Sequence, residues 1–198
     1  IRVLHNHGHL AYLVGGCVRD RILGNVPQDF DISTDATPAE LLTYFPMARQ
    51  VGAHFGVIRV PGPGGTYVEV ATFRSDHGYE DGRRPTQVHF ERDPRQDVLR
   101  RDFTINALLE DIVTGEVIDY VGGRADLAAG VVRAIGDPTL RFREDHLRLL
   151  RAIRFAARFG FNVEAGTFAA MRKAAPSIST IAAERVREEL TRILTEGG

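Results

Sequence analysis

Two aspartates separated by one residue, Asp29 and Asp31 in the segment Gln28-Asp29-Phe30-Asp31-Ile32-Ser33, could bind a metal ion. Polar and apolar residues alternate here as in a half-buried strand, so both carboxylates would lie on one face. Two carboxylates this close repel each other unless a cation neutralises them, and their hard oxygens suit Mg²⁺, which keeps positions for phosphate oxygens. Taken alone, the same spacing also fits an ordinary solvated strand.

A glycine turn precedes these aspartates. Residues 12–14 are typical of a short buried strand, Gly15 and Gly16 of a turn, and residues 17–23 of a helix ended by Gly24. Bare backbone N–H groups at the start of that helix could hold a phosphate, with Arg19 on its first turns. A tight strand-to-helix turn without any ligand is the alternative for the two glycines.

A third carboxylate, Glu69, lies within a run of strand-forming residues from Tyr67 to Phe73. The run follows residues 57–60 after a turn of proline and glycine, which predicts a hairpin. Glu69 would be costly to bury without a partner, so it could serve as a metal ligand. A solvent-facing glutamate on a half-exposed strand fits the sequence equally well.

The remaining pattern places these residues in an α+β fold. Thr37-Pro38-Ala39-Glu40 predicts a capped helix over about 38–45, residues 74–87 a charged loop, and residues 112–118 a second hairpin. A helical pattern begins at Asp97. Three later helices are expected over 142–159, 164–175 and 183–194. We therefore expect a mixed sheet with helices, followed from about residue 137 by an all-helical segment.

Composition bounds the class of protein. The 198 residues are 43% hydrophobic and 26% charged, which is typical of a folded domain, and no apolar run approaches the ~20 residues that span a bilayer. We expect no membrane segment and no secretion signal. Cys17 is the only cysteine, which fits a reducing compartment and predicts a cytoplasmic location. The net charge of −1 gives no overall attraction to a polyanion, although six arginines fall between positions 141 and 158.

Several segments, in one order along nearly the whole chain, resemble the class II tRNA nucleotidyltransferase and bacterial poly(A) polymerase family. They are Leu13-Val14-Gly15-Gly16-Cys17-Val18-Arg19-Asp20, Leu23-Gly24, Asp29-Phe30-Asp31-Ile32-Ser33-Thr34, Arg100-Arg101-Asp102-Phe103-Thr104-Ile105-Asn106-Ala107, Glu144-Asp145 with Arg148 and Arg151, Arg154-Phe155-Ala156, and Glu184-Arg185 with Glu188-Glu189-Leu190.

The resemblance implies a polymerase-β-like nucleotidyltransferase head over residues 1–136 and a helical neck over residues 137–198, with the family's body and tail domains absent from this chain. It implies two Mg²⁺ ions on Asp29 and Asp31, with Glu69 as a third catalytic carboxylate. One ion would lower the pKa of the RNA 3′-hydroxyl, and both would brace the α-phosphate while pyrophosphate leaves.

The resemblance also implies the nucleotide-binding residues. The triphosphate is expected at Gly15, Gly16 and Arg19, the ribose and the head geometry at Arg101, Asp102 and Asn106, and base reading at Asp145 and Arg148 with Arg151 and Arg154 beside them. Residues three apart on a helix are neighbours, and an acceptor with a forked donor can imitate a Watson–Crick edge. A surface ion pair between Asp145 and Arg148 is the simpler alternative.

Two stretches bear on which member of the family this is. Residues 51–57 depart from the Gly-(Arg/Lys)-(Arg/Lys)-Phe signature of the poly(A) polymerases, which favours a tRNA nucleotidyltransferase. Residues 74–85, with Gly78 and Gly82, resemble the flexible loop of enzymes that add the terminal A. We therefore expect CCA or A addition to tRNA from CTP and ATP. Open alternatives are a poly(A) polymerase adding AMP to RNA 3′ ends, a small-molecule nucleotidyltransferase and a non-catalytic RNA-binding module.

Overall fold

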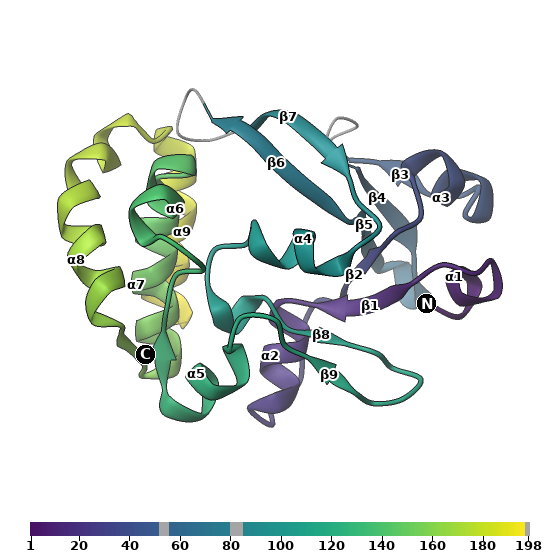
Figure 1. Cartoon of the computed structure of the whole chain (residues 1–198), viewed down its shortest axis with the longest axis horizontal. Coiled ribbons are helices and arrows are strands. Elements are labelled where there is room, and N and C mark those ends of the chain that lie inside the picture. Colours follow the sequence, from purple (N-terminus) through teal and green to yellow (C-terminus); the bar gives the residue numbers. More distant parts are fainter. Residues whose placement is uncertain (52–55, 80–84, 197–198) are drawn as a thin grey trace. The chain divides into compact units, whose positions relative to one another are not determined.

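Short apolar strands build the sheet that carries the aspartate segment. In the computed structural model, which describes residues 1–51, 56–79 and 85–196 (Figure 1), seven of the strands form one sheet in the order β3-β4-β5-β2-β1-β8-β9. Their bounds are β1 Ala11–Val14, β2 Asp31–Thr34, β3 Arg49–Gln50, β4 Val57–Pro61, β5 Tyr67–Thr72, β8 Leu109–Glu110 and β9 Val117–Ile118. Neighbouring strands are antiparallel apart from β2 and β5, which are parallel. The mixed sheet confirms the predicted fold class.

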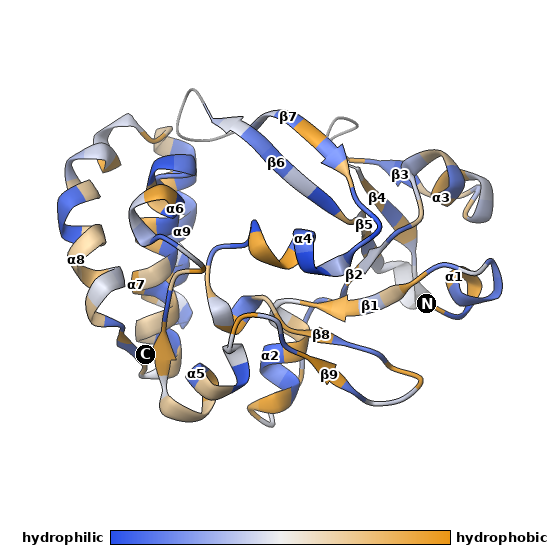
Figure 2. Cartoon of the chain, viewed as in Figure 1, coloured by the Kyte–Doolittle hydropathy of each residue, from blue (hydrophilic) through white to orange (hydrophobic). Residues whose placement is uncertain are grey.

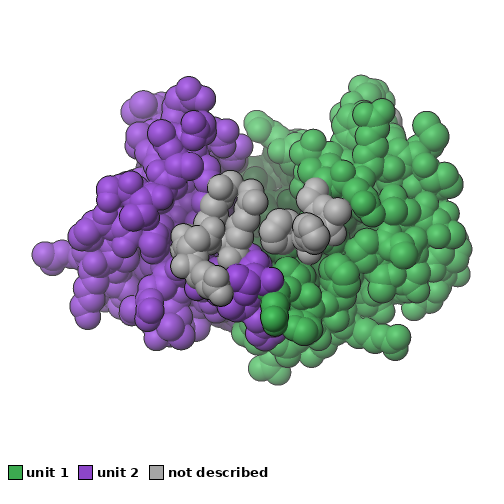
Figure 3. All heavy atoms as spheres, turned by 90° about the horizontal axis from the view of Figure 1, so that it is seen from above, with its two compact units in different colours: residues 1–76, 87–100, 106–120 green, residues 77–86, 101–105, 121–198 purple. Residues whose placement is uncertain are grey.

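Contacts within the chain define two compact units (Figure 3). Unit 1 comprises residues 1–76, 87–100 and 106–120, and unit 2 comprises residues 77–86, 101–105 and 121–198. The seven-stranded sheet belongs to unit 1. The contacts separate these units chiefly between residues 120 and 121. The expected division into a head and a neck at residues 136 and 137 stays a prediction.

Four helices accompany the sheet in unit 1, counted over the described residues: α1 Arg2–Asn6, α2 Gly16–Ile22, α3 Pro38–Tyr44 and α4 Pro94–Leu99. The start of α3 is as the sequence predicts, since the Glu40 backbone N–H donates to Thr37 Oγ1 at 3.4 Å and the Thr37 N–H donates to the Glu40 carboxylate at 2.7 Å. Leu41 of this helix is buried with Ile58 and Val70 of the sheet. A hydrophobic core therefore fixes one face of the strands.

Two predictions about local structure are wrong in this part of the chain. The described residues of the range 74–87 are not a loop, because β6 Arg74–Tyr79 and β7 Pro85–Phe90 form a two-stranded sheet. Figure 2 shows why the pattern failed: β6 is largely hydrophilic, so no apolar alternation marks it as a strand. The helical pattern expected from Asp97 onward is instead the short helix α4, which begins at Pro94, where Asp93 accepts a hydrogen bond from the Arg95 N–H at 2.9 Å, and ends at Leu99.

Unit 2 is mainly helical, as expected for the C-terminal part. Its elements are α5 Gly123–Ala129, β10 Val131–Val132, α6 Pro138–Glu144, α7 Arg148–Phe159, β11 Asn162–Val163, α8 Ala165–Ala174 and α9 Ala183–Glu196. The short strands β10 and β11 pair in parallel. The described residues also form 3₁₀ turns at Pro63–Gly65 in unit 1 and at Ala175–Thr180 in unit 2. In the turn Thr104–Asn106, the first two residues belong to unit 2 and Asn106 belongs to unit 1.

The single helix predicted over residues 142–159 is wrong, since two helices occupy that range. Asp145 interrupts them with an extended backbone, φ −146° and ψ 106°, and its carboxylate accepts a hydrogen bond from the Leu147 N–H at 3.0 Å. A short polar side chain that bonds to nearby backbone in this way competes with helical hydrogen bonding. The predicted end of the second helix is confirmed, because Gly160 adopts φ 66° there.

Among residues 1–51, 56–79 and 85–196, no helix combines the length and the apolar character that crossing a bilayer requires. Residues 52–55, which hold most of the stretch compared with the poly(A) polymerase signature, lie outside the described residues. The same is true of Gly82, one of the two glycines expected to act as hinges.

Candidate active site

The two aspartates lie at the start of β2. Asp31 opens the strand and Asp29 precedes it, so the strand predicted from residue 29 begins two residues late. The later start follows from the pairing of β2 with β1. That pairing extends only as far as Leu13 opposite Ile32, because the chain leaves β1 at the Gly15 turn. Both aspartates are exposed. Their carboxylates are therefore accessible to a ligand without belonging to one regular strand.

Glu69 is the neighbour of Asp31 on the adjacent strand. The parallel pairing of β2 with β5 places Asp31 opposite Glu69 and Ile32 opposite Val70. Val70 is buried in the core and Ile32 packs against it. Side chains alternate between the two faces of a sheet, so Asp31 and Glu69 share the face that points away from this core. The structure thus brings together two of the three carboxylates that the sequence predicted.

The Glu69 carboxylate pairs with Arg59 of β4. Arg59 Nε and Nη2 both lie 2.9 Å from Glu69 Oε1, and about half of each side chain is exposed. The sequence analysis missed Arg59. Its only signal is a period-two position in the predicted hairpin, and a hairpin register cannot be fixed when the loop length is uncertain.

The residues present fit a hard divalent cation. The exposed Asp29 and Asp31 and the half-buried Glu69 offer carboxylate oxygens, which is the donor chemistry that Mg²⁺ prefers. Among the described residues no group of three or more His, Cys, Asp and Glu side chains is arranged to hold a metal. Mg²⁺ typically uses only one or two protein carboxylates and fills its other positions with water and substrate phosphates. A pair of aspartates therefore suffices for such a site.

The glycine turn is shaped as predicted, and its backbone requires glycine. Gly15 adopts φ 79° and ψ −127°, a conformation that side chains strongly disfavour, and its N–H donates to the Leu108 carbonyl at 3.1 Å. Gly16 then starts α2. A Cβ at Gly16 would lie 3.5 Å from Nη2 of Arg19, which is ordinary contact. The turn thus places the helix start beside the guanidinium of Arg19.

Arg19 itself is buried and paired. Its Nε and Nη2 donate to Asp20 Oδ1 at 2.9 and 2.8 Å, and its Nη1 donates to Asn106 Oδ1 in a short hydrogen bond. The structure therefore joins two predicted residues, Arg19 and Asn106, although they are far apart in the sequence. Their binding of a nucleotide stays a prediction.

The buried Asp102 forms an ion pair with the half-buried Arg151 in unit 2. Arg151 Nε and Nη2 donate to Asp102 Oδ2 at 2.8 and 2.7 Å, and Asp102 Oδ1 accepts from the Phe103 N–H at 2.8 Å. Burial alone would raise the pKa of Asp102, but the charges of Arg151 and Arg148 and these hydrogen bonds outweigh it and lower the pKa from 3.8 to about 2. Asp102 is therefore ionised at neutral pH and holds residues 101–105 against α7.

The predicted base-reading pair does not lie on one helix. Asp145 lies between α6 and α7 and accepts from Arg185 Nη2 at 3.0 Å and Nη1 at 3.3 Å, whereas Arg148 begins α7 and pairs with Glu144 at 2.6 Å. The expected i,i+3 geometry is wrong for the reason given above, the break at Asp145. Each residue is instead held by its own partner, and base reading stays a prediction for both.

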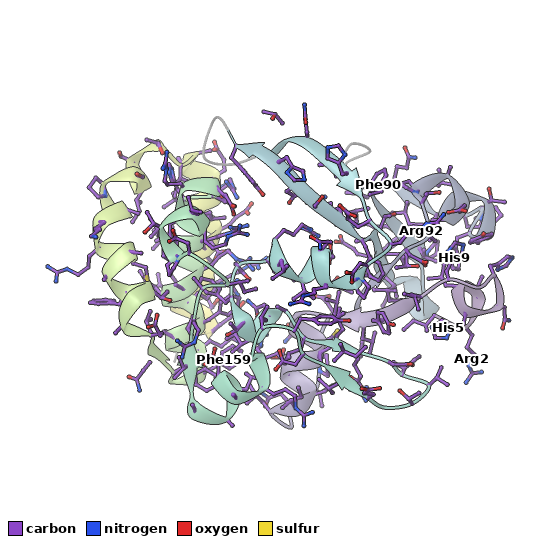
Figure 4. The ribbon with its side chains drawn as sticks, viewed as in Figure 1. Arg2, His5, His9, Phe90, Arg92 and Phe159 are labelled. Carbon is purple, nitrogen blue, oxygen red and sulfur yellow. The ribbon has the colours of Figure 1, made fainter. Side chains whose placement is uncertain are left out.

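Arg154 is the most deeply buried of the predicted arginines in α7. Its Nε lies 2.7 Å from Glu189 of α9, and its guanidinium stacks on the Phe155 ring, 4.4 Å from the centroid. Phe155 in turn stacks on Phe159, which Figure 4 labels at the end of α7. Arg154 therefore joins α7 to α9. Nucleotide binding by Arg154, and by the half-buried Arg101, stays a prediction.

A polar cluster near the N-terminus was not foreseen from the sequence. His9, labelled in Figure 4, hydrogen-bonds through Nδ1 to Asp35 and through Nε2 to Tyr44, both at 3.1 Å. The His7 ring stacks on Tyr44 with 4.0 Å between centroids. These contacts connect the segment after α1 to the end of β2 and to α3, which is a packing role.

Comparison with known proteins places the chain in a family. Residues 11–133 match the family described as the poly A polymerase head domain. This chain belongs to that family. Residues 160–198 of this poly A polymerase head-domain protein match a second family, described as a probable RNA and SrmB-binding site of polymerase A.

The relatives of this family member include CCA-adding enzymes. The CCA-adding enzyme of Bacillus pumilus (strain SAFR-032) is 45% identical over 194 residues, 98% of this chain and 48% of that protein. The crystal structure of the Bacillus stearothermophilus CCA-adding enzyme in complex with CTP is 38% identical with a TM-score of 0.89, over 98% of this chain and 46% of that one. The Thermotoga maritima CCA-adding enzyme complexed with tRNA-CCA is 30% identical with a TM-score of 0.81, over 99% and 45%. The chain thus spans about half the length of the relatives it matches.

Proposed function

We propose that this chain is the head and neck of a template-independent nucleotidyltransferase that adds CCA, or the terminal A, to tRNA 3′ ends from CTP and ATP. Pyrophosphate is the second product. The observation that carries the proposal is the group of accessible carboxylates at the start of β2, with Asp31 beside Glu69 and Asp29 just before them. Relatives that the chain matches over slightly less than half of their length are named CCA-adding enzymes, and two of them are solved with CTP and with tRNA, which supports this choice of substrates.

Asp29 and Asp31 would hold two Mg²⁺ ions, with Glu69 as the neighbouring carboxylate. When bound, such ions stabilise charge on the transferred phosphate and make a 3′-hydroxyl easier to deprotonate. The chain's own contribution is to keep the carboxylates accessible at the start of a rigid strand. Packing of Ile32 against the core fixes that strand, so the position of Asp31 is set by the sheet.

Gly15, Gly16 and Arg19 are proposed to bind the triphosphate. Support comes from the conformation of the turn, which a residue with a side chain would not readily adopt, and from the guanidinium beside it. Asn106 would act on Arg19, because its side-chain oxygen accepts the hydrogen bond that fixes the guanidinium.

We propose that Asp145 and Arg148 read the base. Asp145 would do so from the junction between α6 and α7, and Arg148 from the start of α7. Arg185 and Glu144 hold them in place. Arg151 acts through Asp102, and Arg154 acts through the packing of α7 on α9. A role of Arg101 at the ribose rests on the family resemblance alone.

The proposed partners are the tRNA 3′ end, CTP and ATP, and the proposed location is the cytoplasm. A single, buried cysteine is consistent with a reducing compartment.

Product length on a tRNA that lacks its CCA end tests the proposal. With Mg²⁺, CCA addition should extend the tRNA by two nucleotides with CTP alone and by three with both triphosphates, whereas addition of the terminal A alone should require a tRNA that already ends in CC. In either case Asp31→Ala should abolish extension. Glu116→Gln, at an exposed position just before β9, is the matched control and should extend normally. A long tail from ATP alone would favour a poly(A) polymerase, and transfer to a small hydroxylated acceptor without RNA would favour a small-molecule enzyme. Full activity in Asp31→Ala would refute the catalytic assignment.

A further inference from the structure

Four charged residues form a row across four adjacent strands of unit 1. The registers place Arg49 of β3 opposite Arg59 of β4, Arg59 opposite Glu69 of β5, and Glu69 opposite Asp31 of β2. Residues opposite each other in a sheet share a face, so all four lie on the face away from the core. Two positive side chains are thus followed by two negative ones, and the boundary between the signs falls at the Arg59–Glu69 ion pair.

A ligand could displace the Arg59–Glu69 ion pair, because the fold does not depend on it. About half of each side chain is exposed, and both guanidinium contacts go to the single oxygen Oε1. An ion pair this exposed contributes little to stability. It does, however, neutralise a carboxylate that would otherwise repel Asp31 on the next strand.

We propose that Arg59 is the built-in counter-ion of Glu69 and a positioning residue for the metal site at Asp29 and Asp31. The inference rests on the proposed function, because it requires that these aspartates bind a divalent cation. In the structure the Arg59 guanidinium contacts Oε1 of Glu69. A cation bound beside Asp31 competes with Arg59 for the Glu69 carboxylate, so that Arg59 weakens metal binding and keeps the site exchangeable.

The geometry distinguishes this role from a general effect of positive charge. Arg49 carries the same charge on the same face but lies one strand, about 4.8 Å, farther from the carboxylates. A through-space effect falls off gradually with distance and does not depend on Glu69. An effect carried by the ion pair requires Glu69 and is specific to Arg59.

Mn²⁺ binding to the chain, without nucleotide or RNA, tests the proposal. The free Mn²⁺ signal in electron paramagnetic resonance gives the dissociation constant directly, and circular dichroism checks that each variant is folded. Arg59→Gln should bind Mn²⁺ about three- to tenfold more tightly than the unaltered chain, because the guanidinium no longer competes with the cation for the Glu69 carboxylate. Arg49→Gln should change the Mn²⁺ dissociation constant by less than about twofold. Arg59→Lys keeps the charge, so its dissociation constant should lie close to that of the unaltered chain.

The double variants decide between the two explanations. If Arg59 acts through Glu69, the Arg59→Gln effect should fall below about twofold in a Glu69→Gln background. An unchanged constant in Arg59→Gln, or an equal tightening with and without Glu69, would overturn the proposal. Failure of the proposed function is a different result: Asp31→Ala would then bind Mn²⁺ as well as the unaltered chain does.

Discussion

Replacing Asp102 by asparagine should destabilise the protein at neutral pH by an amount that the structure specifies. The pKa of the buried carboxyl falls from 3.8 to about 2, chiefly because the charges of Arg151 and Arg148 outweigh the opposing effect of burial. Each pKa unit corresponds to about 1.4 kcal/mol, so the ionised carboxylate adds about 2.5 kcal/mol to the free energy of unfolding. Because Arg151 keeps about a third of its side chain exposed, it can rehydrate after the change. The loss should therefore stay near this figure and below the 3–5 kcal/mol of a fully buried pair.

The pH dependence gives the prediction its sign. A carboxyl whose pKa is lowered by folding stabilises the protein above its unfolded-state pKa, and that contribution is lost as the pH falls through the folded-state pKa. The difference between the original chain and Asp102→Asn should be complete above about pH 5. It should shrink to about 1.3 kcal/mol at pH 3 and continue to fall toward pH 2.

Guanidinium unfolding, followed by circular dichroism at a series of pH values, measures this difference. Glu188→Gln removes an exposed carboxylate of α9 and serves as the control, with an expected change within about 0.5 kcal/mol at every pH. A difference for Asp102→Asn that stays constant from pH 7 to pH 3 would show that the ion pair is not its source. No difference at pH 7 would contradict the burial and pairing on which the reasoning depends.

Three further predictions concern unit 1. Gly15→Ala should lower the free energy of urea unfolding by about 1–3 kcal/mol, because Gly15 has a φ of 79° and a ψ of −127°. Gly64→Ala, at φ 66° and ψ 22°, should lower it by only about 1 kcal/mol. Equal effects would argue against strain at the turn. Thr37→Ala should lower the unfolding free energy by about 1 kcal/mol through loss of the capping box, and an unchanged midpoint would contradict that role. Burial raises the pKa of the Cys17 thiol, so an aromatic disulfide reagent at pH 8 should react with it only on unfolding; immediate colour in the native state would refute its burial.

Local signals in the sequence predicted the parts of the fold that local chemistry determines. The capped start of α3 at Thr37 and the glycine end of α7 at Gly160 depend on hydrogen bonds within a few residues, and both are confirmed. The polar strand β6 gave no apolar alternation and was missed. The break at Asp145 was missed because its cause is one side chain bonding to the backbone two residues on, within a stretch whose apolar spacing is helical.

For the candidate site, residue types were predictable and partners were not. The acidic segment at Asp29 and Asp31 is visible in the sequence because its pattern is local. Glu69 becomes the neighbour of Asp31 only through the parallel pairing of β2 with β5, and Arg59 reaches Glu69 only through one particular hairpin register. Likewise, the bond between Arg19 and Asn106 depends on how β8 returns to β1. Tertiary pairing of this kind leaves no trace in composition or periodicity.

The strand order also has a consequence for synthesis on the ribosome. β1 lies inside the sheet, between β2 and β8, and its Val14 pairs with Leu109, which follows 95 residues later (109 − 14). At about 5–20 residues per second, roughly 5–20 seconds pass before that neighbour emerges. During this interval the nascent chain exposes one unpaired edge of an apolar strand, the kind of edge that adds foreign strands. Slow codons between residues 35 and 108 would lengthen the exposure, so the period of greatest aggregation risk comes before the sheet can close.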